Sequence, residues 1–209
     1  MLSQKQIGIL GTGAYVPEAV LTNQDLEKLV ATSAEWIVER SGIHERRIAA
    51  PEEDTVTMAV LAGRQALADA GIEPEQLSFI ILGTNTSPHF FPAAAIQVQE
   101  ELGIGGKAAA FDIQAGCCGF NYALYVGERL VLPESAYALV IGSDTNSRFT
   151  DWTDRGTCML FGDGAGAVVL GPGNRGRIIK SFVASKLNMN LVCETEFNNE
   201  VSPFLPIQT

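Results

Sequence analysis

The chain has 209 residues and a formal net charge of −10, with 46% hydrophobic and 18% charged residues. This composition predicts a globular protein with a substantial core, and it argues against a nucleic-acid partner, because phosphate binding draws on clustered Lys and Arg. No apolar run approaches the roughly 20 residues that span a bilayer. Because residues 1–9 also lack a basic region followed by an apolar stretch, the expected location is the cytoplasm, with no membrane partner.

The first third of the chain predicts one strand and three helices. An apolar strand at 7–10 runs into a glycine-rich turn at 11–13. Polar capping residues begin two short helices, at about 22–29 and 33–40. A longer helix is expected at about 54–70, because its apolar residues fall on one stripe.

The middle third of the chain alternates strand and helix. Residues 79–82 and 108–113 are short, continuous apolar runs, as expected of strands that are covered on both faces. Between them, Pro92 suits the first turn of a helix that ends near residue 103. Another helix follows at about 118–130. Strands that are spaced by helices predict a mostly parallel sheet with helices on both faces.

The last third of the chain predicts further strands and then changes in character. Residues 136–142 are expected to be a buried strand. Residues 158–170, which glycines interrupt, are expected to be a strand pair or a bent strand. From residue 186 onward asparagines are frequent and the strand–helix rhythm is lost. We therefore predict a domain at 1–185 and an atypical tail at 186–209.

Neither a metal ion nor a nucleotide cofactor is expected. The four cysteines lack the spacing of a zinc site, and reduced thiols are the simplest interpretation. The glycines at 11 and 13 resemble part of a dinucleotide-binding motif, but Val16 stands where its third glycine is needed. The glycine-rich run at 162–166 lacks the Lys and the Ser or Thr of a phosphate-binding loop. Its glycines are expected to allow close backbone approach near the active site.

The segment 110–124 carries the strongest chemical signal. An apolar strand ends, Ala115 and Gly116 make a tight turn, and Cys117 stands where a helix begins. The free amides and the dipole of a helix start stabilise a thiolate and can donate to a developing oxyanion, which acyl transfer requires. From this segment alone, the alternative that Cys117 and Cys118 are small core residues stays open.

Several segments together resemble one family. They occur in the family's order and at its spacing, and they are residues 11–17, 32–43, 45–49, 110–124, 154–157 and 161–167. Over about residues 7–179 the chain is similar to the β-ketoacyl-acyl carrier protein synthase III enzymes. The resemblance implies an α/β, thiolase-like fold with a mixed, mainly parallel sheet between helical layers. It also implies that this chain holds the amino-terminal half of that fold.

The resemblance implies an activity as well. Members of the family condense an acyl-CoA primer with malonyl-acyl carrier protein to start fatty acid synthesis, and they do so through an acyl-cysteine thioester. No cofactor is expected, because the coenzyme A thioester is a substrate. The implied partners are therefore acyl-CoA, malonyl-acyl carrier protein and a second copy of the chain in a homodimer.

The family register assigns the nucleophile. Family members place the reactive cysteine two residues before a Gly-Phe pair, which is Gly119 and Phe120 in this chain. Cys117 is therefore the implied nucleophile. Cys118 remains the alternative.

The resemblance also assigns substrate-binding residues, which are Trp36, Arg40, Arg155, Thr32 and Phe91. An indole face can stack on adenine and guanidinium groups can meet phosphate oxygens, so the first three are expected in the coenzyme A channel. Thr32 is expected to add a polar contact, and Phe91 to shape the acyl pocket across the dimer interface. Without the resemblance, the two aromatic residues would be packing residues and the two arginines would be solvated surface charges.

The family's condensation step also uses a histidine and an asparagine from the second half of its fold. The chain has two histidines. His44 is expected in a surface turn and His89 in the pocket-lining loop, and neither resembles the family's histidine motif. This chain alone is therefore expected to lack full condensing activity. Two alternatives stay open, a truncated non-catalytic relative and an acyltransferase that acts on oxygen or nitrogen.

Overall fold

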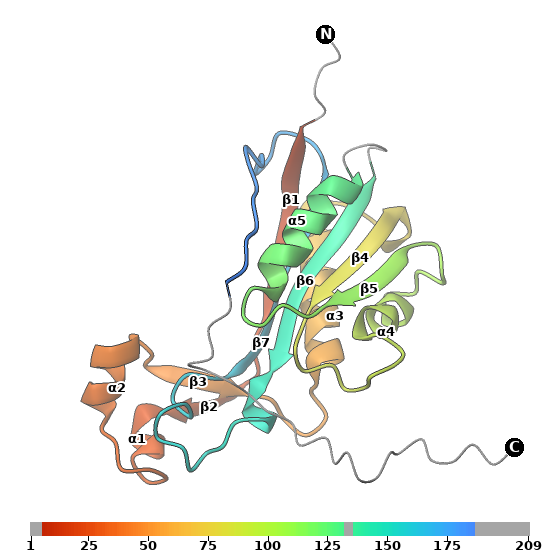
Figure 1. Cartoon of the computed structure of the whole chain (residues 1–209). Coiled ribbons are helices and arrows are strands. Elements are labelled where there is room, and N and C mark those ends of the chain that lie inside the picture. Colours follow the sequence, from red (N-terminus) through yellow and green to blue (C-terminus); the bar gives the residue numbers. More distant parts are fainter. Residues whose placement is uncertain (1–5, 132–135, 187–209) are drawn as a thin grey trace, which may run out of the picture.

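Five strands form the main sheet of the computed structural model, which describes residues 6–131 and 136–186 (Figure 1). They are β1 (Ile7–Tyr15), β4 (Leu77–Gly83), β5 (Ala109–Ile113), β6 (Tyr137–Thr145) and β7 (Asp163–Pro172). Their order in the sheet is β1-β7-β6-β4-β5. Four of these five strands point in one direction, and β7 runs antiparallel to both of its neighbours. The predicted mixed, mainly parallel sheet is confirmed for the described ranges.

Helices cover both faces of the main sheet. The helices are α3 (Thr55–Ala70) and α4 (Ala94–Glu101) on one face and α5 (Gly119–Val131) on the other. Along β6, Leu139 and Ile141 are buried with α3 and α4, whereas Ala138 and Val140 are buried with α5. Successive strand side chains point to opposite faces, so a strand covered on both faces is a continuous apolar run in the sequence.

Helix α3 confirms the prediction for residues 54–70. Asp54 caps its start, because the Asp54 Oδ1 accepts a hydrogen bond from the Thr57 backbone N–H at 2.8 Å. Gly71 ends it with a φ of +65°, a left-handed conformation that glycine adopts without strain. The cap and the terminal glycine therefore set both bounds of the helix.

The predicted turn at residues 11–13 is wrong, because Gly11 and Gly13 lie inside the long strand β1. Helix α3 packs against β1 at these two glycines. A Cβ at Gly11 would lie 2.3 Å from the Ala66 carbonyl oxygen, and a Cβ at Gly13 would lie 2.1 Å from the Ala62 carbonyl oxygen. The glycines thus allow direct contact between the helix and strand backbones.

The predicted start of the next helix at Pro92 is also wrong. Helix α4 begins at Ala94, and the residue before it, Ala93, has no capping side chain. Instead, the Asp112 carboxylate at the end of β5 accepts hydrogen bonds from the Ala94 and Ala95 backbone N–H groups, both at 2.8 Å. A carboxylate from a neighbouring strand therefore fixes the start of α4.

A smaller unit, which we call the lobe (residues 19–48 and 146–160), lies at one end of the main sheet (Figure 1). Its elements are the antiparallel strands β2 (Ala19–Thr22) and β3 (Glu45–Ile48), the helices α1 (Asn23–Leu26) and α2 (Ala34–Ser41), and a 3-10 turn at Asn146–Arg148. A small cluster of Leu26, Ile37, Cys158 and Met159 fills its interior. A further 3-10 turn, Pro74–Gln76, precedes β4 outside the lobe.

The lobe contains most of the remaining differences from the sequence predictions. Helix α1 ends at Leu26 and not at residue 29, because the chain continues in three-residue turns such as Leu29 N–H to the Leu26 carbonyl at 2.9 Å. The strands β2 and β3 were not predicted. The strand expected from residue 158 begins only at Asp163, and Cys158 lies buried in a turn before it.

The described ranges contain no helix that is both long and apolar enough to cross a membrane. From residue 187 onward the predicted tail lies outside the described residues, so its boundary at 185/186 stays a prediction.

Candidate active site

Cys117 lies in the tight turn that joins β5 to α5. The Cys118 N–H donates to the Ala115 carbonyl at 3.2 Å, and the Gly119 N–H donates to the Gly116 carbonyl at 3.0 Å. The first bond of the helical ladder runs from the Tyr122 N–H to the Cys118 carbonyl at 3.0 Å. Cys117 therefore stands two residues before the first residue of α5, outside the helix and next to its amino-terminal amides.

The thiol of Cys117 is open to solvent. Both Cys117 and Cys118 are exposed and free, whereas Cys158 is buried. Gly116 has a φ of +56°, and a Cβ built on it meets nothing within 4 Å. The interpretation of Cys117 and Cys118 as small core residues is thus excluded by their exposure.

Glycines bring the start of α5 close to the strand ends. A Cβ at Gly83, the last residue of β4, would lie 2.4 Å from the Gly119 carbonyl carbon. A Cβ at Gly142 of β6 would lie 3.0 Å from the Phe120 Cβ. Because no side chain separates these backbones, the helix start lies directly over the carboxyl ends of the parallel strands, where ligands bind in open α/β sheets.

A hollow of about 570 Å³ lies beside this turn. Its lining residues come from the loop after β4 and from the end of β5, and they are Thr84, Asn85, Ser87, Pro88, His89, Phe90, Phe91, Asp112 and Gln114. It thus joins the predicted pocket residue Phe91 to the chain segment that carries Cys117. Phe91 is 76% exposed, so its ring is not the ordinary core residue of the alternative interpretation.

Asp112 is a residue that sequence reasoning missed in this hollow. Both of its carboxylate oxygens accept hydrogen bonds from the start of α4, so the group positions the helix and is not free to act as a base. The signal available in the sequence was an acidic residue inside an otherwise apolar strand. A buried or half-buried carboxylate needs hydrogen-bond donors, and a nearby helix start supplies them.

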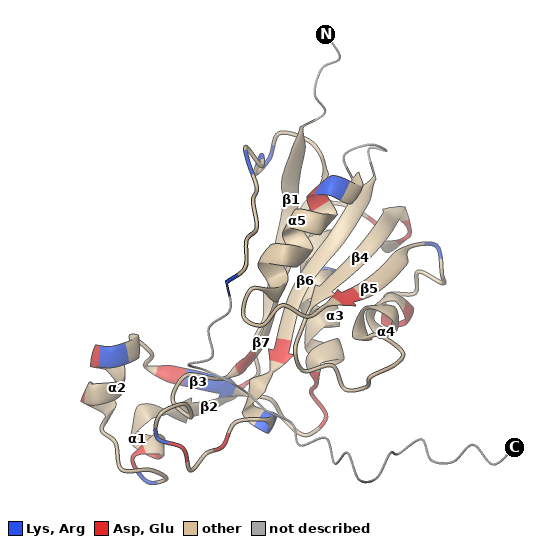
Figure 2. Cartoon of the chain, viewed as in Figure 1, with Lys and Arg blue, Asp and Glu red and all other residues tan. Residues whose placement is uncertain are grey.

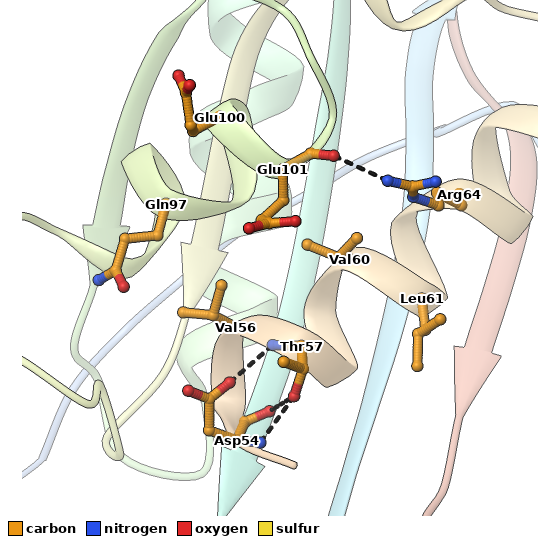
Figure 3. Close-up of a pocket in the computed structure, with 9 residues that line it drawn as sticks. All are labelled: Asp54, Val56, Thr57, Val60, Leu61, Arg64, Gln97, Glu100 and Glu101. Atoms are coloured by element: carbon orange, nitrogen blue, oxygen red, sulfur yellow. Dashed lines mark hydrogen bonds between the residues drawn. The ribbon is translucent and has the colours of Figure 1, made fainter. Parts of the chain in front are cut away.

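A second hollow, of about 610 Å³, lies between α3 and α4 (Figure 3). None of the predicted site residues lines it. Figure 3 shows that Asp54 and Thr57 bond to each other in the helix cap and that the Arg64 guanidinium bonds to the Glu101 carbonyl, at 2.8 Å. Asp54, Thr57 and Arg64 therefore serve the helices, and no cysteine lines this hollow.

The structure brings two predicted coenzyme A residues together in the lobe. The Arg155 guanidinium carbon lies 4.0 Å from the centroid of the Trp36 ring, which is a cation–π contact. Trp36 is half-buried against the lobe cluster, and Arg155 is exposed. Arg40 follows Trp36 by four residues on α2, so the two side chains lie on one face of the helix.

Thr32 lies just before α2. Its backbone N–H donates to the Val30 carbonyl at 2.8 Å. Its hydroxyl oxygen is buried and has no hydrogen-bond partner among the described residues. An unpaired buried hydroxyl costs free energy, and a ligand would reach this atom only if the atoms that cover it move.

Hydrogen bonds shape the turn that presents Arg155. The Asp154 carboxylate accepts hydrogen bonds from the Thr157 hydroxyl and from the Gly156 backbone N–H, the latter at 2.8 Å. Both bonds lower the pKa of Asp154, and the bond from Thr157 has the larger effect. The Thr153 hydroxyl likewise donates to Asp151 at 2.7 Å and lowers the pKa of that carboxyl group. The turn at 151–157 is therefore held by two carboxylates, and both signs of charge lie on the lobe (Figure 2).

Arg46 holds the lobe together from the inside. It is 5% exposed, and its guanidinium donates to the Leu21 carbonyl at 3.0 Å, to Asn23 Oδ1 at 2.7 Å and to the Met159 carbonyl at 3.3 Å. Desolvation lowers the pKa of Arg46. Gly162 packs against Arg46. A Cβ at Gly162 would lie 2.9 Å from the Arg46 Cβ, so the absence of a side chain there leaves room for Arg46.

The two histidines of the chain make no side-chain contact that would support a catalytic role within the described ranges. Both His44 and His89 are exposed, and neither ring takes part in a hydrogen bond with the residues that the structure describes. His89 lines the hollow beside the turn, as predicted, and His44 lies in the turn after α2. Within the same residues, no three metal-binding side chains form a cluster.

Comparisons with known proteins agree with this geometry. A family model for 3-oxoacyl-[acyl-carrier-protein (ACP)] synthase III matches residues 111–187. A β-ketoacyl-[acyl-carrier-protein] synthase III of Citrobacter koseri is 48% identical over 200 residues, which are 95% of this chain and 63% of the relative. The one of Rhodospirillum centenum is 56% identical over 163 residues, 78% of this chain and 50% of the relative.

Solved structures give the same result. The crystal structure of 3-oxoacyl-[acyl-carrier-protein] synthase III from Aquifex aeolicus superposes with a TM-score of 0.77 at 50% identity, and the match covers 80% of this chain and 54% of that one. The sheet order, the helices on both faces and these matches define a partial thiolase-type fold.

The chain belongs to the 3-oxoacyl-[acyl-carrier-protein] synthase III family, which is also called the β-ketoacyl-acyl carrier protein synthase III family. It spans about half to two thirds of the length of the curated relatives that it matches. The predicted family and fold class are therefore confirmed.

Proposed function

We propose that Cys117 accepts an acyl group from a coenzyme A thioester, in the first half of a β-ketoacyl-acyl carrier protein synthase III reaction. The observation that carries this proposal is the placement of an exposed thiol in the turn directly before α5. In the whole protein, the acyl group would then condense with malonyl-acyl carrier protein to start fatty acid synthesis. The proposed location is the cytoplasm, and no cofactor takes part.

The acyl transfer follows from the position of the thiol. The Cys117 thiolate attacks the thioester carbonyl carbon, and a tetrahedral oxyanion forms. The Phe120 and Asn121 N–H groups in the first turn of α5 have no partner within the described ranges and would donate to that oxyanion, whereas the Gly119 N–H already bonds to the Gly116 carbonyl at 3.0 Å. The carbonyl then re-forms, the coenzyme A thiolate leaves with the electron pair and takes a proton, and the acyl group stays on Cys117.

The lobe would hold the nucleotide end of coenzyme A. In the structure the Arg155 guanidinium lies against the Trp36 ring. For the adenine ring to enter between them, Arg155 must move outward by the thickness of one aromatic ring. Adenine would then stack on the indole, and Arg155 and Arg40 would reach phosphate oxygens. The unpaired hydroxyl of Thr32 supports its assignment as a further polar contact.

The hollow beside the turn would hold the acyl chain. Phe91 and Phe90 lie in its wall and are 76% and 94% exposed, which is a costly arrangement for two large aromatic side chains. A second copy of the chain in a homodimer would cover them, and this supports the proposed role of Phe91 across the dimer interface. The described residues of one chain leave Phe90 and Phe91 uncovered, so the covering surface would come from the second copy.

The condensation step needs more than the printed chain supplies. The family's histidine and asparagine are expected outside the segment that this chain covers, and the exposed rings of His44 and His89 do not replace them. General acid–base help is worth about 10²–10⁴-fold and each oxyanion donor about 10²–10³-fold. The printed chain is therefore proposed to stop at the acyl-Cys117 thioester.

Intact mass after incubation with acetyl-CoA tests the proposal. The chain is expected to gain one acetyl group, Cys117→Ala is expected to gain none, and the matched variant Cys118→Ala is expected to behave as the parent chain. No gain in the folded parent chain would favour a non-catalytic relative, and equal gain in Cys117→Ala would show that Cys117 is not the acyl acceptor. Carbon dioxide release from malonyl-acyl carrier protein would separate condensation from acyl transfer to oxygen or nitrogen.

A further inference from the structure

Two consecutive exposed thiols stand in the turn before α5, and the proposed acyl transfer uses only one of them. We call Cys117 and Cys118 the thiol pair. Both thiols are free, and neither sulfur takes part in a hydrogen bond within the described ranges. The neighbour Gly116 adds no side chain, and the space around its missing Cβ is empty to 4 Å. A reagent from solvent can therefore reach both sulfur atoms.

The backbone at the thiol pair does not hold the two sulfurs on opposite faces of a strand. In a strand, successive side chains point to opposite faces, but Cys118 lies in a turn at the helix start and not in a strand. Consecutive Cα atoms are about 3.8 Å apart, and each cysteine can rotate about one bond among three staggered positions. Both residues are exposed, so rotamers that point to solvent are open to each side chain.

This spacing favours a bridging atom over a direct disulfide. Ordinary disulfides join Cα atoms that are about 4.4–6.8 Å apart, so consecutive cysteines are too close for an unstrained S–S bond. A large, soft atom bound to both sulfurs leaves the sulfurs further apart than a direct bond does. Thiolates are the soft ligands that such centres prefer over nitrogen or oxygen.

We propose that the thiol pair is a two-sulfur binding site for a soft, trivalent electrophile of the organoarsenical class. Phenylarsine oxide serves as the probe. Its arsenic forms one bond to each sulfur, its oxygen leaves with the two thiol protons as water, and arsenic remains trivalent throughout. No oxidant or reductant is needed. The product removes the Cys117 thiol from acyl chemistry, so the site is also a point of inhibition.

The test measures the intact mass of the chain. It relies on the fact that a monothiol removes arsenic bound to one sulfur, whereas removal of arsenic bound to two sulfurs requires a dithiol. The parent chain is treated with one equivalent of phenylarsine oxide and then with excess 2-mercaptoethanol or excess 2,3-dimercaptopropanol. We expect one adduct that withstands the monothiol and is removed by the dithiol. No acyl donor is present, so the outcome does not depend on the proposed function.

Single-cysteine variants locate the site. Cys118→Ser and Cys117→Ser are each expected to lose the adduct that withstands 2-mercaptoethanol, while their circular dichroism and thermal midpoints stay as in the parent chain, because both side chains are exposed. The other two cysteines of the chain are Cys158 and Cys193, and the controls Cys158→Ala and Cys193→Ser are expected to keep it. Retention of the resistant adduct in Cys118→Ser, or its loss in either control, would overturn the proposal, as would its absence from the folded parent chain.

Discussion

The main sheet and the lobe are built by different physical means. Two large apolar clusters, one on each face of the sheet, hold β1, β4, β6 and β7 together with α3, α4 and α5. The lobe has a small apolar cluster, and it depends on polar groups such as Arg46, whose guanidinium joins the nearby residues Leu21 and Asn23 to the distant Met159. The proposed nucleophile stands on the sheet side, and the proposed nucleotide contacts stand on the lobe.

This difference teaches where each part of the function is vulnerable. Apolar burial is spread over many side chains, so the sheet places Cys117 robustly. The lobe places Trp36 and Arg155 through a few hydrogen bonds, and a single substitution can therefore loosen them. Changes in the lobe should alter coenzyme A binding before they alter the thiol, and changes at the sheet should remove both together.

The largest effect is expected from Gly13→Ala in β1. The new Cβ would lie 2.1 Å from the Ala62 carbonyl oxygen, and neither backbone can move away without separating α3 from the sheet. We expect the free energy of unfolding to fall by about 3 kcal/mol or more. Urea unfolding followed by circular dichroism measures it. The control is Gly166→Ala in β7, where a Cβ meets nothing within 4 Å, and equal losses in the two variants would contradict the packing account.

A smaller and local effect is expected from Arg46→Ala. Removal of the guanidinium leaves buried acceptors at Leu21, Asn23 and Met159 without their donor, which costs about 1–3 kcal/mol. Amide hydrogen exchange should become faster in α1 and α2 but stay unchanged in β4 and β6. The half-exposed neighbour Arg47 gives the matched control Arg47→Ala, for which little change is expected. Faster exchange throughout the sheet would show that the lobe is not a separate unit.

Arg155→Ala should weaken the use of acetyl-CoA without unfolding the chain. The Arg155 side chain is exposed, so the thermal midpoint should not change. The concentration of acetyl-CoA that gives half-maximal acylation should rise about 10-fold, which corresponds to the loss of one charge-assisted hydrogen bond. The control is Arg129→Ala, which removes another cation–π contact, to Tyr125 on α5. The same rise in both variants would remove Arg155 from the proposed coenzyme A site.

The smallest effect is expected from acid at the start of α1. Hydrogen bonds from Lys28 and then from Thr22 lower the pKa of Asp25 from 3.8 to about 2. Since the folded pKa lies below the unfolded one, the stabilising contribution is present above about pH 4 and is lost as the pH falls toward 2. The protection factors for amide hydrogen exchange in α1, which correct for the intrinsic pH dependence of exchange, should therefore fall over this range, and Asp25→Asn should lack that step. An identical pH response in Asp25→Asn would contradict the assignment.

The same comparison explains what the sequence could predict. The buried strands β4, β5 and β6 and the helix α3 follow from apolar runs and from the Asp54 and Gly71 boundaries, because local residues determine them. The strands β2 and β3 were missed because each has only four residues, and Glu45–Ile48 has no apolar pattern; their pairing with each other and Arg46 define them. The turn expected at Gly11 and Gly13 was wrong. Glycine is needed at these two positions because α3, far along the chain, packs directly against the β1 backbone there.

The candidate site was predictable only in part for the same reason. Cys117 follows from a local pattern of strand, small residues and helix, and the structure places it in that turn. The bonds between Asp112 and the start of α4 join segments that are 17 and 18 residues apart, so no local pattern contains them. The contact of Trp36 with Arg155 joins parts of the chain that are more than one hundred residues apart, and only the family resemblance put both in one channel.

The most direct test of the central claim is to locate the acyl group. The chain is incubated with acetyl-CoA, digested at low pH, where thioesters persist, and the modified peptide is sequenced by tandem mass spectrometry. Acetyl on the sulfur at 117 is the predicted result. Acetyl on Cys118 or Cys158, or on no cysteine of the folded chain, would contradict the claim that the turn before α5 presents the acyl acceptor.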